Sequence, residues 1–216
     1  MTVALIPVKR LEESKSRLLP ELPDARRQAL TLAMLEDLIE SLSETRPVDR
    51  IAVTTPDPLV AERASAAGAE ILMREEPGLN AALEDGRERL KIDAGDGFLI
   101  VLGDVAGALP TDFERLIEAG HADARPGVWL APSSDGGTSA LLQIPANTIA
   151  CSFGRNSAAR HREAATAVGV AYHEVELESL LIDLDQPEDL EAFLKSDTGG
   201  RRTRALLESA ERKNPE

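Results

Sequence analysis

Four basic residues stand close together near the start of the chain. Lys9, Arg10, Lys15 and Arg17 fall within the first 20 residues, which also hold two acids and so carry a net charge of +2. Lysine presents a point charge to phosphate and arginine a planar pair of donors, so this segment suits a polyphosphate. It lacks the glycines that a Walker loop or a dinucleotide-binding turn requires. A solvated surface loop is the alternative interpretation.

Aspartates follow at three later positions. Asp104 comes directly after a strongly apolar stretch, and Asp183 and Asp185 are two residues apart, so in an extended segment their side chains share one face. Neighbouring carboxylates repel each other unless a cation lies between them. Carboxylate oxygens are ligands that suit Mg²⁺. Together the three aspartates predict a magnesium site, although each one alone is equally typical of a loop or a helix cap.

Two glycine-containing segments could bind an anion. Residues 135–140 include Thr138, and residues 153–157 include Gly154 and Ser157. Glycine lets backbone amides approach an anion closely, and hydroxyl groups add donors. Ser157 also precedes a stretch of helical period, and the amides at a helix start favour an oxyanion. A hairpin turn and an ordinary serine cap are the alternatives.

The apolar pattern alternates between strands and helices. Short apolar runs predict strands at residues 3–8, 51–55, 70–73, 97–102, 128–131, 139–144 and 172–175. Longer periodic stretches predict helices at residues 24–42, 58–67, 79–90, 112–119 and 157–168, and one more after Pro187. This order predicts an α/β domain with a mixed, mostly parallel sheet flanked by helices. Ligands of such sheets bind beyond the carboxyl ends of the strands, where the polar segments described above are expected.

Composition narrows the class of protein. The chain has 216 residues, 43% of them hydrophobic, and 38 acids against 24 bases give a net charge of −14, which argues against a nucleic-acid-binding protein. The length predicts one domain, residues 1–195, followed by a C-terminal tail, residues 196–216, that ends in a loose helix. Cys151 is the single cysteine, so no intramolecular disulfide can form. Without a secretory leader or an apolar run of membrane length, a soluble, cytoplasmic protein without a membrane partner is expected.

The order of these motifs resembles the phospholactate guanylyltransferase family (CofC/FbiD) of coenzyme F(420) biosynthesis. The resemblance runs from Val3 to about Leu194. It is carried by IPVKR at 6–10, KSRL at 15–18, GLN at 78–80, GD at 103–104, DGGTSAL at 135–141, Phe-Gly with a following serine and histidine at 153–161, and LIDLDQPEDL at 181–190. It implies a single-domain fold like that of the nucleotide-diphospho-sugar transferases, a GT-A-type nucleotidyltransferase.

The resemblance also implies a reaction and its site. An enzyme of this family uses Mg²⁺ to join GMP from GTP to 2-phospho-L-lactate, phosphoenolpyruvate or 3-phospho-D-glycerate, and releases diphosphate. The family's substrate-phosphate contacts match Thr138, Gly154 and Ser157. Its magnesium ligands match Asp104, Asp183 and Asp185. The catalytic cations on the triphosphate would be Lys9, Lys15 and Arg17, and the residues towards the base and ribose would be Asn80 and Asp57.

Two departures leave the acceptor open. The family reads Asp-Leu-Pro-Leu-Leu from the metal aspartate, whereas here Asp104 is followed by Val-Ala-Gly-Ala-Leu-Pro, and Ser139 replaces an asparagine. His161 is more typical of a structural residue or a minor phosphate contact than of a general base. A sugar-phosphate nucleotidyltransferase or glycosyltransferase of the same fold, and a non-catalytic nucleotide-binding protein, are the alternatives. The oligomeric state is open, with a homodimer as one candidate.

Overall fold

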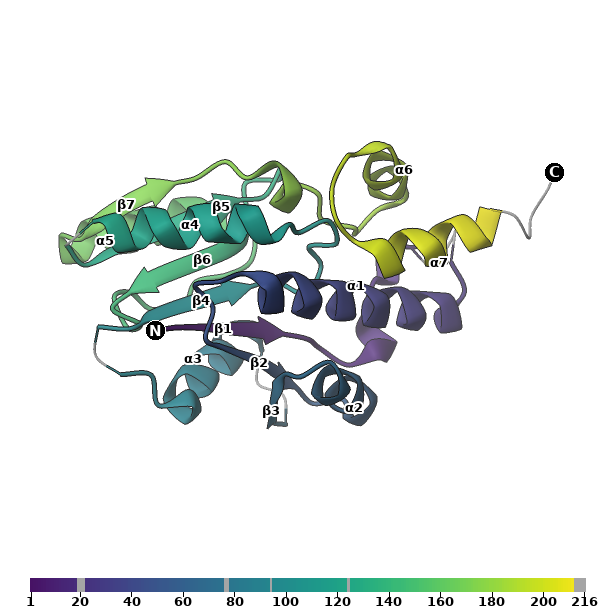
Figure 1. The fold of residues 1–216 in the computed structure, drawn as a ribbon, viewed down its shortest axis with the longest axis horizontal. Coiled ribbons are helices and arrows are strands. Elements are labelled where there is room, and N and C mark those ends of the chain that lie inside the picture. Colours follow the sequence, from purple (N-terminus) through teal and green to yellow (C-terminus); the bar gives the residue numbers. More distant parts are fainter. Residues whose placement is uncertain (19–21, 76–77, 94, 124, 212–216) are drawn as a thin grey trace.

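A computed structural model describes residues 1–18, 22–75, 78–93, 95–123 and 125–211. In this part of the chain seven strands form one sheet in the order β3-β2-β1-β4-β6-β5-β7 (Figure 1). Their bounds are β1 Thr2–Pro7, β2 Arg50–Thr55, β3 Glu70–Met73, β4 Gly97–Val101, β5 Gly127–Pro132, β6 Thr138–Ile144 and β7 Ala171–Glu174. β6 runs antiparallel to both β4 and β5, and the other pairs are parallel, which confirms the predicted mixed, mostly parallel sheet.

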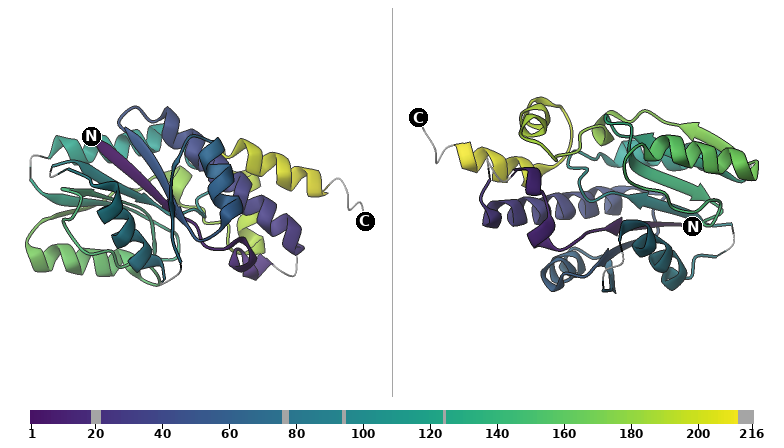
Figure 2. Two further views of the ribbon diagram at one scale, coloured as in Figure 1. Left: turned by 90° about the horizontal axis from the view of Figure 1, so that it is seen from below. Right: turned by 180° about the vertical axis from the view of Figure 1, so that it is seen from behind.

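Helices cover both faces of this sheet (Figure 2). One face is covered by α1 Asp24–Glu44, α2 Pro58–Ala66 and α4 Pro110–Ala122, and the other by α3 Leu79–Leu90 and α5 Ser157–Val168. Successive strand residues point to opposite faces. Accordingly, Ile6 belongs to the apolar cluster that contains Phe113 of α4, while the neighbouring Leu5 belongs to the one that contains Leu83 of α3. The almost uninterrupted apolar sequence of the central strands follows from this two-sided burial.

The C-terminal helices lie beyond the carboxyl ends of β1 and β4 (Figure 1). α6 Pro187–Lys195 and α7 Arg201–Glu211 join a third apolar cluster through Phe193 and Leu207, and α7 packs along α1. The segment expected as a loosely helical tail therefore contains a packed helix. The division at residue 195 stays a prediction.

Most element bounds lie within a few residues of the predicted ones. The sequence pattern missed three short 3-10 turns, η1 Leu11–Glu13, η2 Ser16–Leu18 and η3 Glu178–Leu180, because three residues are too few to show a period. Among the described helices, none is both long and apolar enough to cross a membrane.

Candidate active site

The carboxyl ends of β1, β2 and β4 surround a cavity of about 400 Å³. The start of α3 forms another wall with Leu79 and Ala82. This is where a parallel sheet is expected to bind its ligand, and the volume is that of a small-molecule site. Several lining residues carry charge, namely Lys9, Glu13, Lys15, Arg74, Asp104 and Asp185.

The basic segment meets the acidic one at this cavity. The side chain of Lys15 is 7% exposed, and its Nζ lies 3.6 Å from Asp183 Oδ1. Arg17 Nη1 donates to Asp185 Oδ2 at 2.8 Å. Lys9 is exposed and lines the cavity. The predicted cations and carboxylates are thus brought together from segments about 170 positions apart in sequence.

The backbone pairs Asp104 with Asp183 across a short bridge. Val105 and Asp183 form an isolated antiparallel bridge, and the Leu184 amide donates to the Asp104 carbonyl at 3.4 Å. Asp183 Oδ1 is buried and finds no hydrogen-bond donor among the described residues. Burial, and next the negative charge of Asp104, raise the pKa of Asp183 to about 7.

Two of the three predicted carboxylates, Asp104 and Asp183, lie close together, and the metal triad stays a prediction. Within the described residues, no group of three or more His, Cys, Asp or Glu side chains is arranged to hold a metal ion. Asp185 is turned towards Arg17 instead. Mg²⁺ needs only one or two protein carboxylates when substrate phosphates supply other ligands. The buried, donorless oxygen of Asp183 opposite Asp104 meets that requirement.

A second polar group lies at the start of β6 and α5. Thr138 Oγ1 is 2.8 Å from Ser157 Oγ and 3.3 Å from His161 Nδ1, and all three side chains are buried. The Ser152 amide donates to His161 Nε2 at 3.0 Å. Because Nε2 accepts this hydrogen bond, the proton of the neutral ring is on Nδ1, which donates to Thr138. Burial, together with the charge of Arg160, lowers the pKa of His161 to about 4, which keeps the ring neutral.

This group of side chains has one donor hydrogen more than it has hydrogen-bonded contacts. His161, Thr138 and Ser157 bring three donor hydrogens to two contacts. One hydroxyl proton is therefore left without an acceptor among these side chains. A buried O–H in that state seeks an acceptor, and a phosphate oxygen is a strong one.

β6, which carries Thr138 at its start, pairs with β4, the strand that precedes Asp104. The Leu102 amide donates to the Ser139 carbonyl at 3.0 Å, which holds the start of β6 beside the chain segment that leads to Asp104. Gly154, with φ +116°, forms the exposed turn before α5. Its carbonyl accepts from the Ser157 amide, so that amide is used within the turn. The structure thus brings Thr138 and Ser157 into contact, with Gly154 in the turn that precedes Ser157.

Two residues predicted near the base and ribose have other partners. Asn80 Nδ2 donates to the Phe153 carbonyl, and Asn80 Oδ1 accepts from the Phe153 amide at 2.7 Å, which ties α3 to that loop. Asp57 accepts from the amides of Leu59 and Leu11, so it caps α2 and anchors the basic segment. Neither belongs to the described lining of the cavity. Their nucleotide contacts remain predictions, while their structural roles are evident.

Sequence reasoning missed Thr54 in the cavity wall. Its Oγ1 is buried and has no hydrogen-bond partner among the described residues. Arg74 also lines the cavity, with Nη1 donating to the Ala81 carbonyl at 2.8 Å. Thr54 is the last residue but one of β2, and Arg74 follows β3. This position at the carboxyl ends of parallel strands was the available signal.

Comparison with known proteins finds guanylyltransferases over nearly the whole chain. Residues 2–210 match the family model "Guanylyl transferase CofC like". A phosphoenolpyruvate guanylyltransferase of Sphaerobacter thermophilus is 36% identical over 191 residues, which cover 88% of this chain and 91% of the relative. A 3-phospho-D-glycerate guanylyltransferase of Colwellia psychrerythraea is 31% identical over 190 residues, which cover 88% and 90%.

The fold has a wider distribution than the sequence family. The crystal structure of a candidate nucleotide-diphospho-sugar transferase from Desulfovibrio desulfuricans G20 superposes with a TM-score of 0.73 at 15% identity, covering 98% of this chain and 95% of the other. At that identity the likeness establishes the fold alone, which is the one predicted. The sequence matches go further, and by them the chain belongs to the CofC guanylyltransferase family.

Proposed function

We propose that this protein transfers GMP from GTP to phosphoenolpyruvate or 3-phospho-D-glycerate and releases diphosphate. The names of the related guanylyltransferases supply the two acceptors. The observation that supports the proposal is that Asp104 lines a cavity with basic side chains, while the next residue, Val105, is bridged to Asp183. Two phosphorylated ligands could meet there.

In this proposal the two sides of the site have different tasks. The cavity takes GTP, with Lys9, Lys15 and Arg17 towards its phosphates. Thr138, Gly154 and Ser157 take the phosphate of the acid. Mg²⁺ bound by Asp104 and Asp183, and by Asp185 once phosphate competes for Arg17, would neutralise phosphate charge.

The chemistry requires positioning rather than a general base. A phosphate oxygen of the acceptor attacks the α-phosphorus of GTP, and the bond from that phosphorus to the bridging oxygen of diphosphate breaks. The attacking oxygen is already ionised at neutral pH, so no side chain must remove a proton. Two unit charges 4 Å apart repel by about 4 kcal/mol at intermediate dielectric, which the cations must offset. His161 is neutral and buried, and serves the hydroxyl pair instead.

A diphosphate-release assay tests the proposal. GTP, ATP, CTP and UTP are each combined with phosphoenolpyruvate, 3-phospho-D-glycerate, 2-phospho-L-lactate and a sugar 1-phosphate. We expect release with GTP and one or both of the first two acids. Release only with the sugar phosphate would support the alternative of a sugar-phosphate nucleotidyltransferase. GTP binding without release from any pair would support a non-catalytic protein.

Ser157→Ala tests the acceptor side separately. Losing a hydrogen bond to a charged phosphate should raise the KM for the acid by about ten- to a hundredfold, and leave the KM for GTP nearly unchanged. Ser43→Ala is the matched control, because Ser43 is exposed and bonds to its own helix. An unchanged acceptor KM in Ser157→Ala would remove Ser157 from the site.

A further inference from the structure

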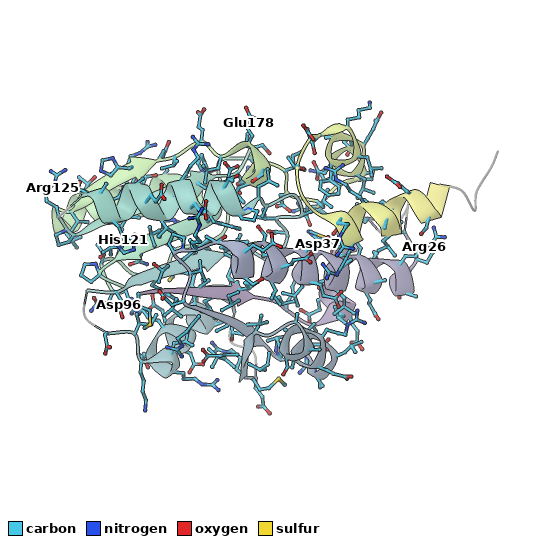
Figure 3. All side chains as sticks on the ribbon, in the orientation of Figure 1. Arg26, Asp37, Asp96, His121, Arg125 and Glu178 are labelled. Atoms are coloured by element: carbon cyan, nitrogen blue, oxygen red, sulfur yellow. The ribbon has the colours of Figure 1, made fainter. Side chains whose placement is uncertain are left out.

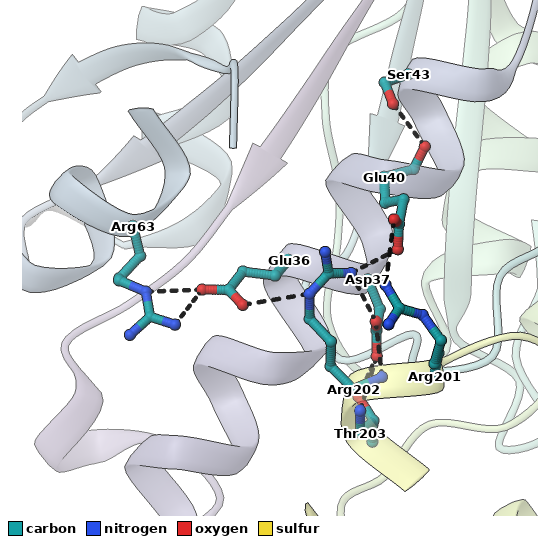
Figure 4. Close-up of polar contacts among 8 residues, drawn as sticks. All are labelled: Glu36, Asp37, Glu40, Ser43, Arg63, Arg201, Arg202 and Thr203. Carbon is teal, nitrogen blue, oxygen red and sulfur yellow. Dashed lines mark hydrogen bonds and ion pairs between the residues drawn. The ribbon is translucent and has the colours of Figure 1, made fainter. Parts of the chain in front are cut away.

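The C-terminal helix is anchored on α1 by one buried carboxylate. Asp37, whose side chain is 5% exposed, accepts from the backbone amides of Arg202 and Thr203 and from Thr203 Oγ1, at 2.8–3.0 Å. Figure 3 places Asp37 where α7 passes α1, and Figure 4 shows Arg202 also reaching Glu36 and Glu40. An acid from one helix thus caps the first turn of another, which fixes where α7 begins.

The turn that leads into α7 is pressed against the loop that follows Asp104. The Gly199 amide donates to the Gly107 carbonyl at 2.9 Å. A Cβ on Gly200, which has φ +83°, would lie 2.4 Å from the Ala106 carbonyl oxygen. A Cβ on Gly107 would lie 2.6 Å from Thr198 Oγ1. Both glycines are needed for this close approach, and Gly200 also for its backbone conformation.

The same loop is continuous with the paired carboxylates. Ala106 is two residues after Asp104, and the intervening Val105 bridges to Asp183. Ala106 also belongs to one apolar cluster with Leu184, which follows Asp183, and with Phe193 of α6. A displacement at Ala106 therefore acts on both carboxylates, one through the chain and the other through the bridge.

We propose that residues 196–211 are a positioning element of the active site, which holds the loop after Asp104 so that Asp104 and Asp183 share one cation. The proposal rests on the proposed function in its use of these aspartates as metal ligands. It explains two features of the sequence together. The loop Val-Ala-Gly-Ala-Leu-Pro departs from the family pattern, and the segment after Ser196 was expected to be a tail. Each supplies the packing surface of the other.

Gly200→Ala tests the proposal, with Gly169→Ala as the matched control. Both glycines have positive φ, but a Cβ on Gly169 meets nothing within 4 Å. An ordinary contact begins near 3.4 Å, so in Gly200→Ala the new Cβ and the Ala106 oxygen must separate by about 1 Å. Misplacement of that size can cost about a hundredfold in rate. We expect kcat to fall by about that factor in Gly200→Ala and to change by less than about twofold in Gly169→Ala.

Mn²⁺ binding gives a readout that does not depend on turnover. Titration of each full-length variant with Mn²⁺ in the presence of GTP, followed by electron paramagnetic resonance, should show about tenfold weaker binding in Gly200→Ala than in Gly169→Ala. Equal kcat and equal Mn²⁺ affinity in the two variants would overturn the proposal. If the wild type releases no diphosphate with any acid, the proposed function fails, while the Mn²⁺ comparison still decides this proposal.

Gly107→Ala is a second variant in case Gly200→Ala does not fold. Its conflict is with the Thr198 side chain rather than with a carbonyl, and its backbone has no positive φ, so the fold should tolerate it better. We expect the same pattern of lower kcat and weaker Mn²⁺ binding, at about tenfold. Wild-type values in a folded Gly107→Ala protein would also overturn the proposal.

Discussion

Asp183→Asn should make the metal-free protein more stable while it abolishes transfer of GMP. Asp183 is held beside Asp104, its Oδ1 is buried without a hydrogen-bond donor, and Asp185 adds a further negative charge. Lys15 is the attractive neighbour that we find, at 3.6 Å. Asparagine keeps the shape of the side chain and removes the charge that these surroundings disfavour.

The size of the effect can be worked from the pKa of Asp183. A pKa raised from 3.8 to about 7 corresponds to about 4 kcal/mol of disfavoured charge. The side chain as a whole is 35% exposed, so solvent screens part of this energy. We therefore expect Asp183→Asn to raise the free energy of unfolding by about 1–2 kcal/mol at pH 8 in EDTA. Because Mg²⁺ would bind only the folded wild type with its carboxylates intact, saturating Mg²⁺ should reduce or reverse the difference.

Urea unfolding of both proteins, with EDTA and with Mg²⁺, measures these differences. Lys15 acts in the opposite direction. Its side chain is 7% exposed, and a buried lysine that loses its carboxylate partner destabilises a fold. A lower stability of Asp183→Asn in EDTA would show that the Lys15 pair dominates and would refute the reasoning. Asp123→Asn is the control, because the pKa of Asp123 is shifted in the opposite direction: hydrogen bonds from Arg125 lower it to about 2. This substitution should not raise the free energy of unfolding.

Three further variants test other parts of the argument. The His161 ring takes up a proton near pH 6.5 in the unfolded chain and near pH 4 in the folded one, so its contribution to stability is lost as the pH falls through that window. The stability difference between the wild type and His161→Gln should therefore shift in favour of the variant, by up to about 3 kcal/mol, between pH 7 and pH 4 in urea unfolding. Lys9→Ala should raise the KM for GTP by about tenfold relative to Lys195→Ala, since Lys9 lines the cavity and Lys195 pairs with its own helix. Asp37→Ala should lower the free energy of unfolding by about 2–4 kcal/mol and expose α7 to limited proteolysis, because three donors lose one acceptor.

The sheet and its helices were predictable because burial of one face of an element places apolar residues at regular spacing in the sequence. β4 is entirely buried and its sequence is almost wholly apolar, while α1 repeats its apolar residues at helical spacing. The candidate site residues followed from position, since Asp104 lies three residues after the end of β4 and Ser157 begins α5. Residue type and place in an element were enough to bring these residues to one end of the sheet.

Hydrogen bonds from side chains to distant backbone groups leave no periodic pattern in the sequence. Asn80 uses its side chain to hold both polar groups of Phe153, and Asp57 holds the Leu11 amide. No periodicity marks an asparagine or aspartate as a tie between distant loops, so both were assigned to the nucleotide. The same holds for the packing of α7 on α1. One acid in the middle of α1, Asp37, caps α7, and no sequence pattern indicates that contact.

Several features that weaken the fold lie at residues that we propose to bind substrate phosphates or Mg²⁺, or next to them. Lys15 and Asn156 are two of the three described non-glycine residues with positive φ, and they flank the aspartates and precede Ser157 respectively. Strained backbone, a buried oxygen of Asp183 without a hydrogen-bond donor among the described residues, and a hydroxyl proton without an acceptor in its side-chain group each cost stability. Each is a deficit that a phosphate or a divalent cation would correct. If they were accidents of packing, removing them would leave activity intact. Because we attribute them to the site, stabilising changes such as Asp183→Asn should cost activity.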